Sequence, residues 1–361
     1  SEGGESDFEA TGEAPDMMEL EDFDNLPMTK RIELFGMGRW KLAAYMDAPF
    51  HNLAAQIEGA WREMLSPIRL IKLAPDHKWA DSADPSGEMT RAWPIDSRLP
   101  KEYEDRIATD RGWMQIENRA YESEAFRYLH LEVARAPNIG LQVLHCVMFP
   151  RASFDLPIVA MDMVSRNGVV TLAICDASPV SPDMKLPGSY DKYIKRMLEQ
   201  FNMGKVERKL PDWGKAIFSA HCVCISPRDE AQLGDFIRFA VALTRFHVEL
   251  GAMARPILSQ KTMRTRVIAQ QQARYCDLQM QNDKTSTILA SSYSEEFAKR
   301  YMTEVMFPKD PDPTATMPPS KPVEDPFLGW DFDLMGGDRG APEDLSRVMP
   351  GGVDHAAQAE A

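Results

Sequence analysis

The chain has 361 residues, of which 44% are apolar and 27% are charged, so it is long enough to bury a large hydrophobic core. It has no run of eighteen apolar residues, so we expect no transmembrane helix and no membrane partner. The formal net charge is −14, and we expect no nucleic-acid partner.

The acidity belongs to the two ends of the chain. Residues 1–29 hold ten acidic and no basic side chains, and residues 309–361 hold eleven acidic and four basic ones. The remainder is slightly basic. We predict a disordered acidic N-terminal extension (1–29), a folded domain (30–308) and a flexible acidic C-terminal tail (309–361).

The first predicted elements are two helical stretches within 30–65. In the second stretch, apolar side chains recur every three or four residues, at Phe50, Leu53, Ile57 and Trp61. A loop rich in Pro, Asp and Ser follows at 74–100. Short apolar runs typical of strands come next, at 112–118, 128–134, 141–149, 157–164, 168–175 and 217–226.

Helical patterns dominate the rest of the domain. One helix, 188–202, precedes the last strand, and three more are predicted at 228–254, 258–281 and 294–306. The pair Asn167-Gly168 between apolar runs indicates a hairpin, so its two strands should be antiparallel. This order favours a three-layer α/β/α sandwich with a central antiparallel sheet, flanked by the disordered acidic tails.

Five cysteines are present, and no C-x-x-C pair occurs. An odd number without that spacing argues for a reducing compartment and against a disulfide framework or an iron–sulfur site. Cys222 and Cys224 share one face of the predicted 217–226 strand, and we interpret them as small buried hydrophobes. We interpret His221 as structural and predict no metal site.

Three ionisable side chains interrupt three successive apolar strands: Asp162, His145 and Glu132. An unpaired buried carboxylate costs several kcal/mol unless it is protonated, paired or chemically active. His130 lies two residues before Glu132 and so shares its strand face. The pattern predicts a proton-handling pocket within the sheet, and a structural histidine–carboxylate cluster is the alternative.

A series of short motifs occurs in a characteristic order between about 112 and 308. In that order the chain resembles the ferredoxin-dependent bilin reductases. These enzymes reduce biliverdin with single electrons from ferredoxin, through bilin radicals, and carry no flavin or metal. The motifs are found at 113–121, 130–134, 141–150, 155–157, 173–179, 210–214, 217–219, 281–285 and 298–307.

The resemblance implies roles for the strand residues. Asp162 matches the central aspartate, the first proton donor to the bilin, and His145 matches the histidine paired with it. Glu132 matches the glutamate that protonates an outer vinyl group, and His130 matches a histidine that holds this network. Acids with near-neutral pKa values in a low-dielectric pocket suit such chemistry.

Further positions are implied to bind the substrate. Asn282, Asp283 and Lys284 match a motif that faces the bilin, although as residues alone they also fit a solvated turn. Lys284, Arg208 and Thr171 match positions near the two propionates, where cationic donors bind carboxylates.

The resemblance also implies the product. Glutamate and histidine together at positions 132 and 145 are typical of members that convert biliverdin IXα to phycocyanobilin by a four-electron reduction. Phycoerythrobilin or phytochromobilin formation is one alternative, and a non-catalytic bilin-binding carrier or regulatory protein is another. Two departures are Met161, where cysteine is common, and a 135–140 loop about one residue longer, which could shift Glu132 relative to His145.

Acidic ferredoxin is the implied partner and electron donor, and a basic face would steer it. An ordinary solvated surface is the alternative for these side chains. The family implies a monomer. The long tails and the missing first Met favour the chloroplast stroma, with the cyanobacterial cytoplasm as the alternative. The candidate basic residues are Lys192, Lys195, Arg196, Lys205, Arg208, Lys209 and Lys215.

Overall fold

A computed structural model describes much of the predicted domain. All described residues belong to the first of two units, residues 1–328, into which the chain divides. The predicted extension 1–29, nearly all of the predicted loop 74–100 and residues 315–361 lie outside them. The described residues are 40, 42, 45–71, 73, 79–81, 114–203, 208–257 and 263–314.

One antiparallel sheet runs through the described residues and contains eight strands, in the order β1-β3-β4-β5-β6-β7-β8 with β2 also paired to β3. The short strands β1 and β2 were not predicted from the sequence. The strands are β1 (Ile68–Leu70), β2 (Trp79–Asp81), β3 (Gln115–Ser123), β4 (Phe126–Ala136), β5 (Leu141–Pro150), β6 (Ile158–Arg166), β7 (Val169–Ser178) and β8 (Val223–Ile225).

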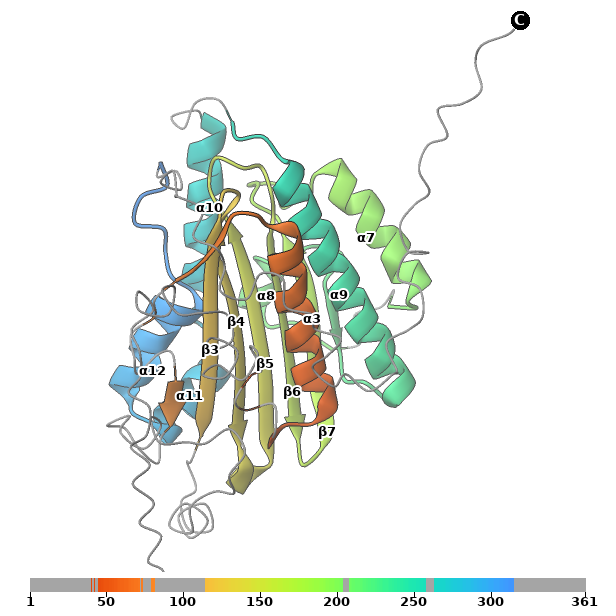
Figure 1. The fold of residues 1–361 in the computed structure, drawn as a ribbon, viewed down its shortest axis with the longest axis vertical. Coiled ribbons are helices and arrows are strands. Elements are labelled where there is room, and N and C mark those ends of the chain that lie inside the picture. The colour runs from red at the N-terminus through yellow and green to blue at the C-terminus, as the bar shows by residue number, and fades with distance from the viewer. Residues whose placement is uncertain are drawn as a thin grey trace, which may run out of the picture. The chain divides into compact units, whose positions relative to one another are not determined.

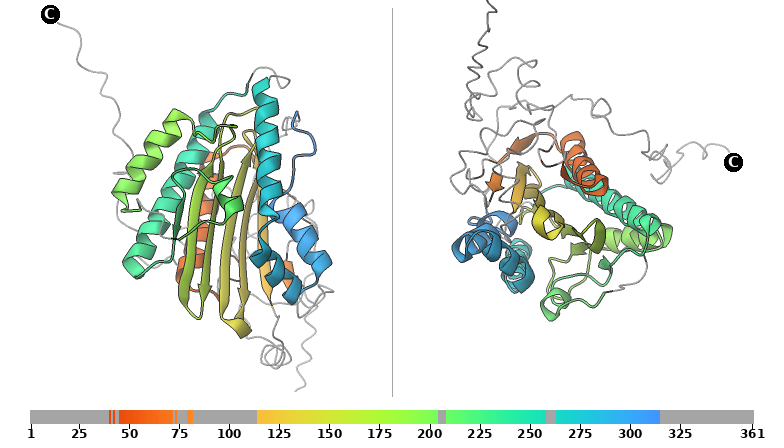
Figure 2. Two further views of the ribbon diagram at one scale, coloured as in Figure 1. Left: turned by 180° about the vertical axis from the view of Figure 1, so that it is seen from behind. Right: turned by 90° about the horizontal axis from the view of Figure 1, so that it is seen from below.

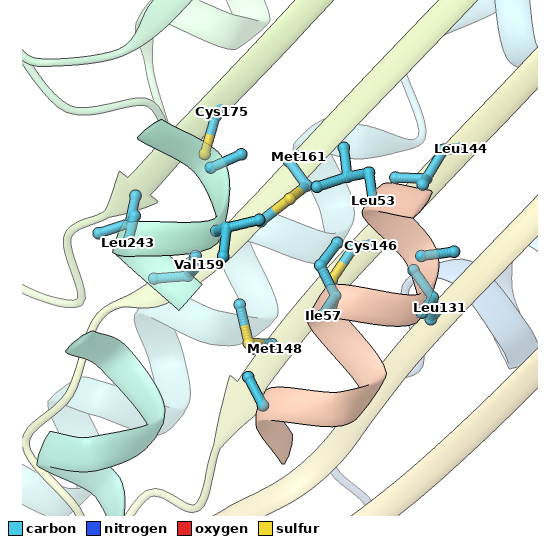
Figure 3. Close-up of a cluster of buried hydrophobic side chains, with 14 of the residues drawn as sticks. Leu53, Ile57, Leu131, Leu144, Cys146, Met148, Val159, Met161, Cys175 and Leu243 are labelled. Carbon is cyan, nitrogen blue, oxygen red and sulfur yellow. The ribbon is translucent and has the colours of Figure 1, made fainter. Parts of the chain in front are cut away.

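Helices α3 (Ala48–Met64) and α9 (Glu230–Met253) cover one face of the sheet, and α7 (Gly188–Gln200) packs on α9 (Figure 1). The predicted stripe of α3, including Leu53 and Ile57, is fully buried. In Figure 3 these two side chains meet Leu131, Met161 and other apolar groups of the sheet. This layer is therefore an apolar core.

The C-terminal helices lie on the opposite face, as the view from behind shows (Figure 2, left). The expected helix 258–281 is observed from residue 263, and the expected helix 294–306 ends in a π-helical turn. With helices on both faces, the predicted α/β/α sandwich is confirmed. The elements are α8 (Asp212–Lys215), α10 (Met263–Gln279), α11 (Asp283–Ser292), α12 (Glu295–Tyr301) and the π-helix η4 (Met302–Met306).

The predicted strand 217–226 is wrong over its first six residues, because only Val223–Ile225 pair with β7. Residues 217–222 instead form a turn, in which the Ser219 backbone N–H and hydroxyl donate to the Asp176 carboxylate. These bonds satisfy the buried carboxylate, which a straight strand could not reach. Cys222 therefore does not share a strand face with Cys224, although both are buried as free thiols.

The connections between strands fix their alignment. Asn167 and Gly168 both have positive φ angles, of 51° and 78°, and close the predicted hairpin between β6 and β7. Between β4 and β5, a 3₁₀ turn η3 (Pro137–Ile139) ends at Gly140, whose φ of 61° suits glycine. Among the described helices, none has the length and apolarity to cross a membrane.

Candidate active site

A row of polar side chains crosses four adjacent strands on the face covered by the C-terminal helices. The strand register pairs Asn118 with Glu132, Glu132 with His145, and His145 with Asp162. Directly paired residues point to the same side of a sheet, so three antiparallel strands bring the three predicted ionisable groups together. The longer 135–140 loop does not displace Glu132, which lies opposite His145.

Asp162 and His145 form a tight pair, with 2.6 Å between Asp162 Oδ1 and His145 Nδ1. The histidine side chain is only 3% exposed, whereas the aspartate side chain is 39% exposed. Burial alone would lower the pKa of His145, but the Asp162 carboxylate, its hydrogen bond and nearby Glu132 raise it above the ordinary value. A proton is therefore held on His145, on the buried side of a partly exposed carboxylate.

Glu132 is 3% exposed and lies 2.9 Å from the Tyr301 hydroxyl of α12. The same hydroxyl lies 2.8 Å from Asn118 Oδ1. Burial raises the pKa of Glu132, and the opposing effects of His145 and Tyr301 offset this only in part. The carboxyl group therefore keeps its proton to higher pH than an exposed glutamate would.

His130 contacts this row through Asn118 rather than through Glu132. Its Nε2 lies 2.8 Å from Asn118 Oδ1, and its ring lies 5.6 Å from that of His145. Burial, together with His145, lowers the pKa of His130 well below its ordinary value. His130 is therefore a neutral hydrogen-bonding residue and no proton store.

A further buried carboxyl group, Asp176, lies on β7 two residues after Ile174, the residue paired with Asp162, and was not singled out from the sequence. Its side chain accepts hydrogen bonds from Ser178 and Ser219, and burial raises its pKa despite them. The signal was present, because Asp176 interrupts an apolar strand as Asp162 does. Its partners identify it as an anchor for the 217–222 turn.

Tyr301 and Asn118 were also missed as site residues. Tyr301 lies in the closing helix motif, but no sequence pattern indicates that its hydroxyl reaches across to β4. Asn118 could have been found only from the β3–β4 register, which places it opposite Glu132. His145 further packs against Phe307, with ring centroids 5.4 Å apart.

Arg208 and Thr171 lie together at the β8 edge of the sheet. The Arg208 guanidinium donates to the Thr171 carbonyl oxygen, and its backbone N–H donates to Cys224. Cys224 continues the register of the polar row through Ile174. Thr171 is the extra, unpaired residue of a bulge in the β6–β7 register. The regular alternation of side chains between the two faces of the sheet is therefore interrupted at this position.

The motif at 282–284 forms the start of α11. Asn282 caps this helix by accepting a hydrogen bond from the Thr285 backbone N–H at 3.4 Å, and Asp283 and Lys284 are exposed. Within the described residues, no hydrogen bond or ion pair joins these three side chains to the polar row. The motif therefore starts a helix of the C-terminal layer, and its two charged side chains are exposed there.

The candidate basic residues do not form one cluster on the site's side of the sheet. Lys192, Lys195 and Arg196 are exposed on α7, which packs on α9 in the opposite layer. Lys209 is exposed beside β8, Lys215 is exposed on α8, which contacts α10, and Lys205 lies outside the described residues. Searched over the described part of the chain, His, Cys, Asp and Glu form no group of three that could hold a metal ion. His221, interpreted from the sequence as structural, lies with its Nε2 within 2.7 Å of Asp191 Oδ1 of α7, a hydrogen-bond distance.

The chain is similar to several known proteins. Phycocyanobilin:ferredoxin oxidoreductase of a Synechococcus species is 37% identical over 194 residues, covering 54% of this chain and 76% of that protein. The enzyme of the same name from Gloeobacter violaceus is 39% identical over 205 residues, covering 56% of this chain and 77% of that protein. A solved structure of phytochromobilin synthase from tomato in complex with biliverdin has 18% identity and a TM-score of 0.47, over 54% of this chain and 69% of that chain.

The sequence pattern that describes the ferredoxin-dependent bilin reductases matches residues 91–308. This match spans more than half of the chain and includes every strand from β3 to β8. The protein is therefore an oxidoreductase that takes its electrons from ferredoxin, and the chain belongs to the ferredoxin-dependent bilin reductase family.

Proposed function

We propose that this protein reduces biliverdin IXα to phycocyanobilin by a four-electron, ferredoxin-driven reaction through bilin radicals. The observation that carries the proposal is the single row of Glu132, His145 and Asp162 on one sheet face. Phycocyanobilin is also the bilin in the name of both relatives described above.

The chemistry requires protons as well as electrons. Each electron added to the tetrapyrrole makes it more basic, and a positioned acid then lowers the barrier to proton transfer. Asp162 is the exposed member of its pair and donates to the bilin. His145, whose pKa is raised, returns a proton to Asp162 through their 2.6 Å contact.

Glu132 is the second donor in this proposal. It lies one strand away from His145 and keeps its proton because burial raises its pKa. Two acids at different places along the row can protonate two different parts of one extended substrate. This supports two two-electron reductions, one of which is directed to a vinyl group by Glu132.

Substrate carboxylates require cationic partners at the edge of the site. Arg208 is half-buried beside Thr171 and Cys224, two strands from Asp162 in the register. Its guanidinium can bind one propionate in bidentate fashion, and exposed Lys284 supplies a second charge. Asn282 and Asp283 hold the start of α11 beside that lysine.

Ferredoxin is expected to approach at the β8 edge and α8, near Lys209 and Lys215, because electrons must reach the bilin over a short distance. Ferredoxins are acidic, so the rate of turnover should fall as ionic strength rises. The lysines of α7 lie in the other layer, and we expect their charges to matter less.

Anaerobic turnover of biliverdin IXα with reduced plant-type ferredoxin tests the proposal, with the products separated by chromatography against bilin standards. The expected end product is phycocyanobilin. Phycoerythrobilin or phytochromobilin as the end product would contradict the proposed product and leave the reductase assignment standing. A shifted bilin spectrum without any reduction would contradict the enzyme and favour a bilin carrier.

A further inference from the structure

One hydroxyl group lies between two acceptor groups beside Glu132. The Tyr301 oxygen is 2.8 Å from Asn118 Oδ1 and 2.9 Å from Glu132 Oε2. A tyrosine hydroxyl has one proton to donate, and an amide oxygen can only accept. Both contacts can therefore be hydrogen bonds only when a second proton is present on Glu132.

We propose that Asn118 is a positioning residue which, through the Tyr301 hydroxyl, holds Glu132 in its acid form. The protonated Glu132 carboxyl donates to the Tyr301 oxygen, and Tyr301 donates in turn to Asn118. If Glu132 were ionised, Tyr301 would turn its proton toward the carboxylate. The Asn118 and Tyr301 oxygens would then face each other at 2.8 Å without a proton between them, which is repulsive.

His130 determines which end of the Asn118 amide faces Tyr301. His130 Nε2 lies 2.8 Å from the same Oδ1 atom, while its buried Nδ1 has no hydrogen-bond partner among the residues that the structure describes. A neutral imidazole carries one N–H, and that proton is best placed on Nε2, where an acceptor is available. The amide oxygen therefore accepts from His130 and Tyr301 at once, which uses both of its lone pairs.

Several titratable groups also face Glu132, and their effects must be separated from that of Asn118. They come from three strands or helices besides β4 itself. The His145 charge favours the ionised form of Glu132, and the Asp162 charge favours the acid form. Asn118 does not titrate, so its effect is the same whatever the charge of this pair. The facing groups are Tyr128 and His130 of β4, His145 of β5, Asp162 of β6 and Tyr301 of α12.

The consequence for turnover rests on the proposed function, because a proton kept on Glu132 is ready for the bilin. The test itself does not depend on the proposed function, since it uses the full-length protein without bilin or ferredoxin. Infrared spectroscopy follows the protonated-carboxyl band of Glu132 against pH, and Glu132→Gln identifies that band by its loss. A failure of this test is therefore distinct from a failure of the bilin chemistry.

We expect Asn118→Leu to move the titration midpoint of Glu132 to lower pH, because the Tyr301 proton becomes free for the carboxylate. Asn118→Asp is the matched variant, since it keeps an acceptor oxygen at this position and should retain the band to at least the wild-type pH. An unchanged midpoint in Asn118→Leu would overturn the proposal, and so would equal downward shifts in both variants.

Tyr301→Phe provides a second, independent test, because it removes the hydroxyl that links the two residues. In this background, Asn118→Leu should cause no further shift of the Glu132 midpoint. The same shift in both backgrounds would show that Asn118 acts on Glu132 by another route, and would overturn the proposal even if Asn118→Asp behaved as expected.

Discussion

The two faces of the central sheet carry side chains of opposite character, apolar on one face and ionisable on the other, at adjacent positions in the same strands. Toward α3 and α9, neighbouring strands pair apolar side chains with one another and bury them completely (Figure 3). Toward the C-terminal helices, the residue adjacent to each of these apolar side chains in its strand is ionisable. The apolar row is Leu131, Cys146 and Met161, and the ionisable row is Glu132, His145 and Asp162.

This difference shows how one sheet supplies both stability and chemistry. The α3 face is closed by two long helices, so its side chains exclude water and stabilise the fold. The opposite face, covered by α10, α11 and α12, leaves the Asp162 side chain 39% exposed. Changes on the first face should therefore affect unfolding, and changes on the second should affect turnover.

The largest expected effect is that of Asp162→Asn. The variant cannot donate the first proton, so we expect turnover to fall roughly 100- to 10,000-fold, the usual range for a general acid. Its thermal unfolding should change little, because the side chain is half-exposed. The measurement is anaerobic bilin reduction together with circular dichroism melting. Wild-type turnover would exclude Asp162 as the donor.

The opposite result is expected from Leu131→Ala on the apolar face. Leu131 is fully buried, so its truncation should cost about 2–5 kcal/mol of unfolding free energy. Turnover per folded molecule should stay within about twofold of wild type, because the site lies on the other face. Denaturant titration and a turnover assay at low temperature check both statements. A stable but inactive variant would contradict the division between the faces.

Glu132→Gln should change how stability depends on pH. Because burial raises the pKa of Glu132, its contribution to stability is complete below the ordinary value of 4.5 and is lost as pH rises through the raised value. The variant should therefore gain stability relative to wild type as pH increases, within about 3 kcal/mol. Denaturant titrations at several pH values measure the difference. A gain in the stability of the variant over wild type that appears only as the pH falls would contradict this prediction.

The smallest effect is expected from Met161→Leu, beside Asp162 but on the apolar face. This nearly volume-conserving change should cost less than about 1.5 kcal/mol and leave the product unchanged. Unfolding and product chromatography are the measurements. A changed product would mean that packing beneath Asp162 controls the chemistry, contrary to the independence of the two faces.

Much of the fold follows from local patterns in the sequence. The α3 stripe, the Asn167-Gly168 hairpin and the alternating strands are local signals, and each was predicted. The 217–222 segment was assigned wrongly because its apolar run is overridden by hydrogen bonds from Ser219 to Asp176, which are distant in the chain. The short strands β1 and β2 depend on pairing with β3 and lack a pattern of their own.

The candidate site was predictable where an ionisable residue interrupts an apolar strand. Glu132, His145 and Asp162 carry that signal, and the register shows that they are adjacent. Tyr301 and Asn118 carry no such signal. Their contribution depends on the contact between the Tyr301 hydroxyl of α12 and Glu132, which are 169 residues apart in the chain. Family resemblance placed Arg208 and Thr171, which the structure brings together at the sheet edge.

The most direct test of this account is a crystal structure of the protein with biliverdin IXα bound. We predict that the tetrapyrrole lies between the sheet and the C-terminal helices, with an Asp162 carboxylate oxygen within hydrogen-bond distance of its pyrrole nitrogens or carbonyl oxygens. A bilin bound elsewhere, with the pair of Asp162 and His145 remote from it, would contradict the assignment of the polar row as the proton supply.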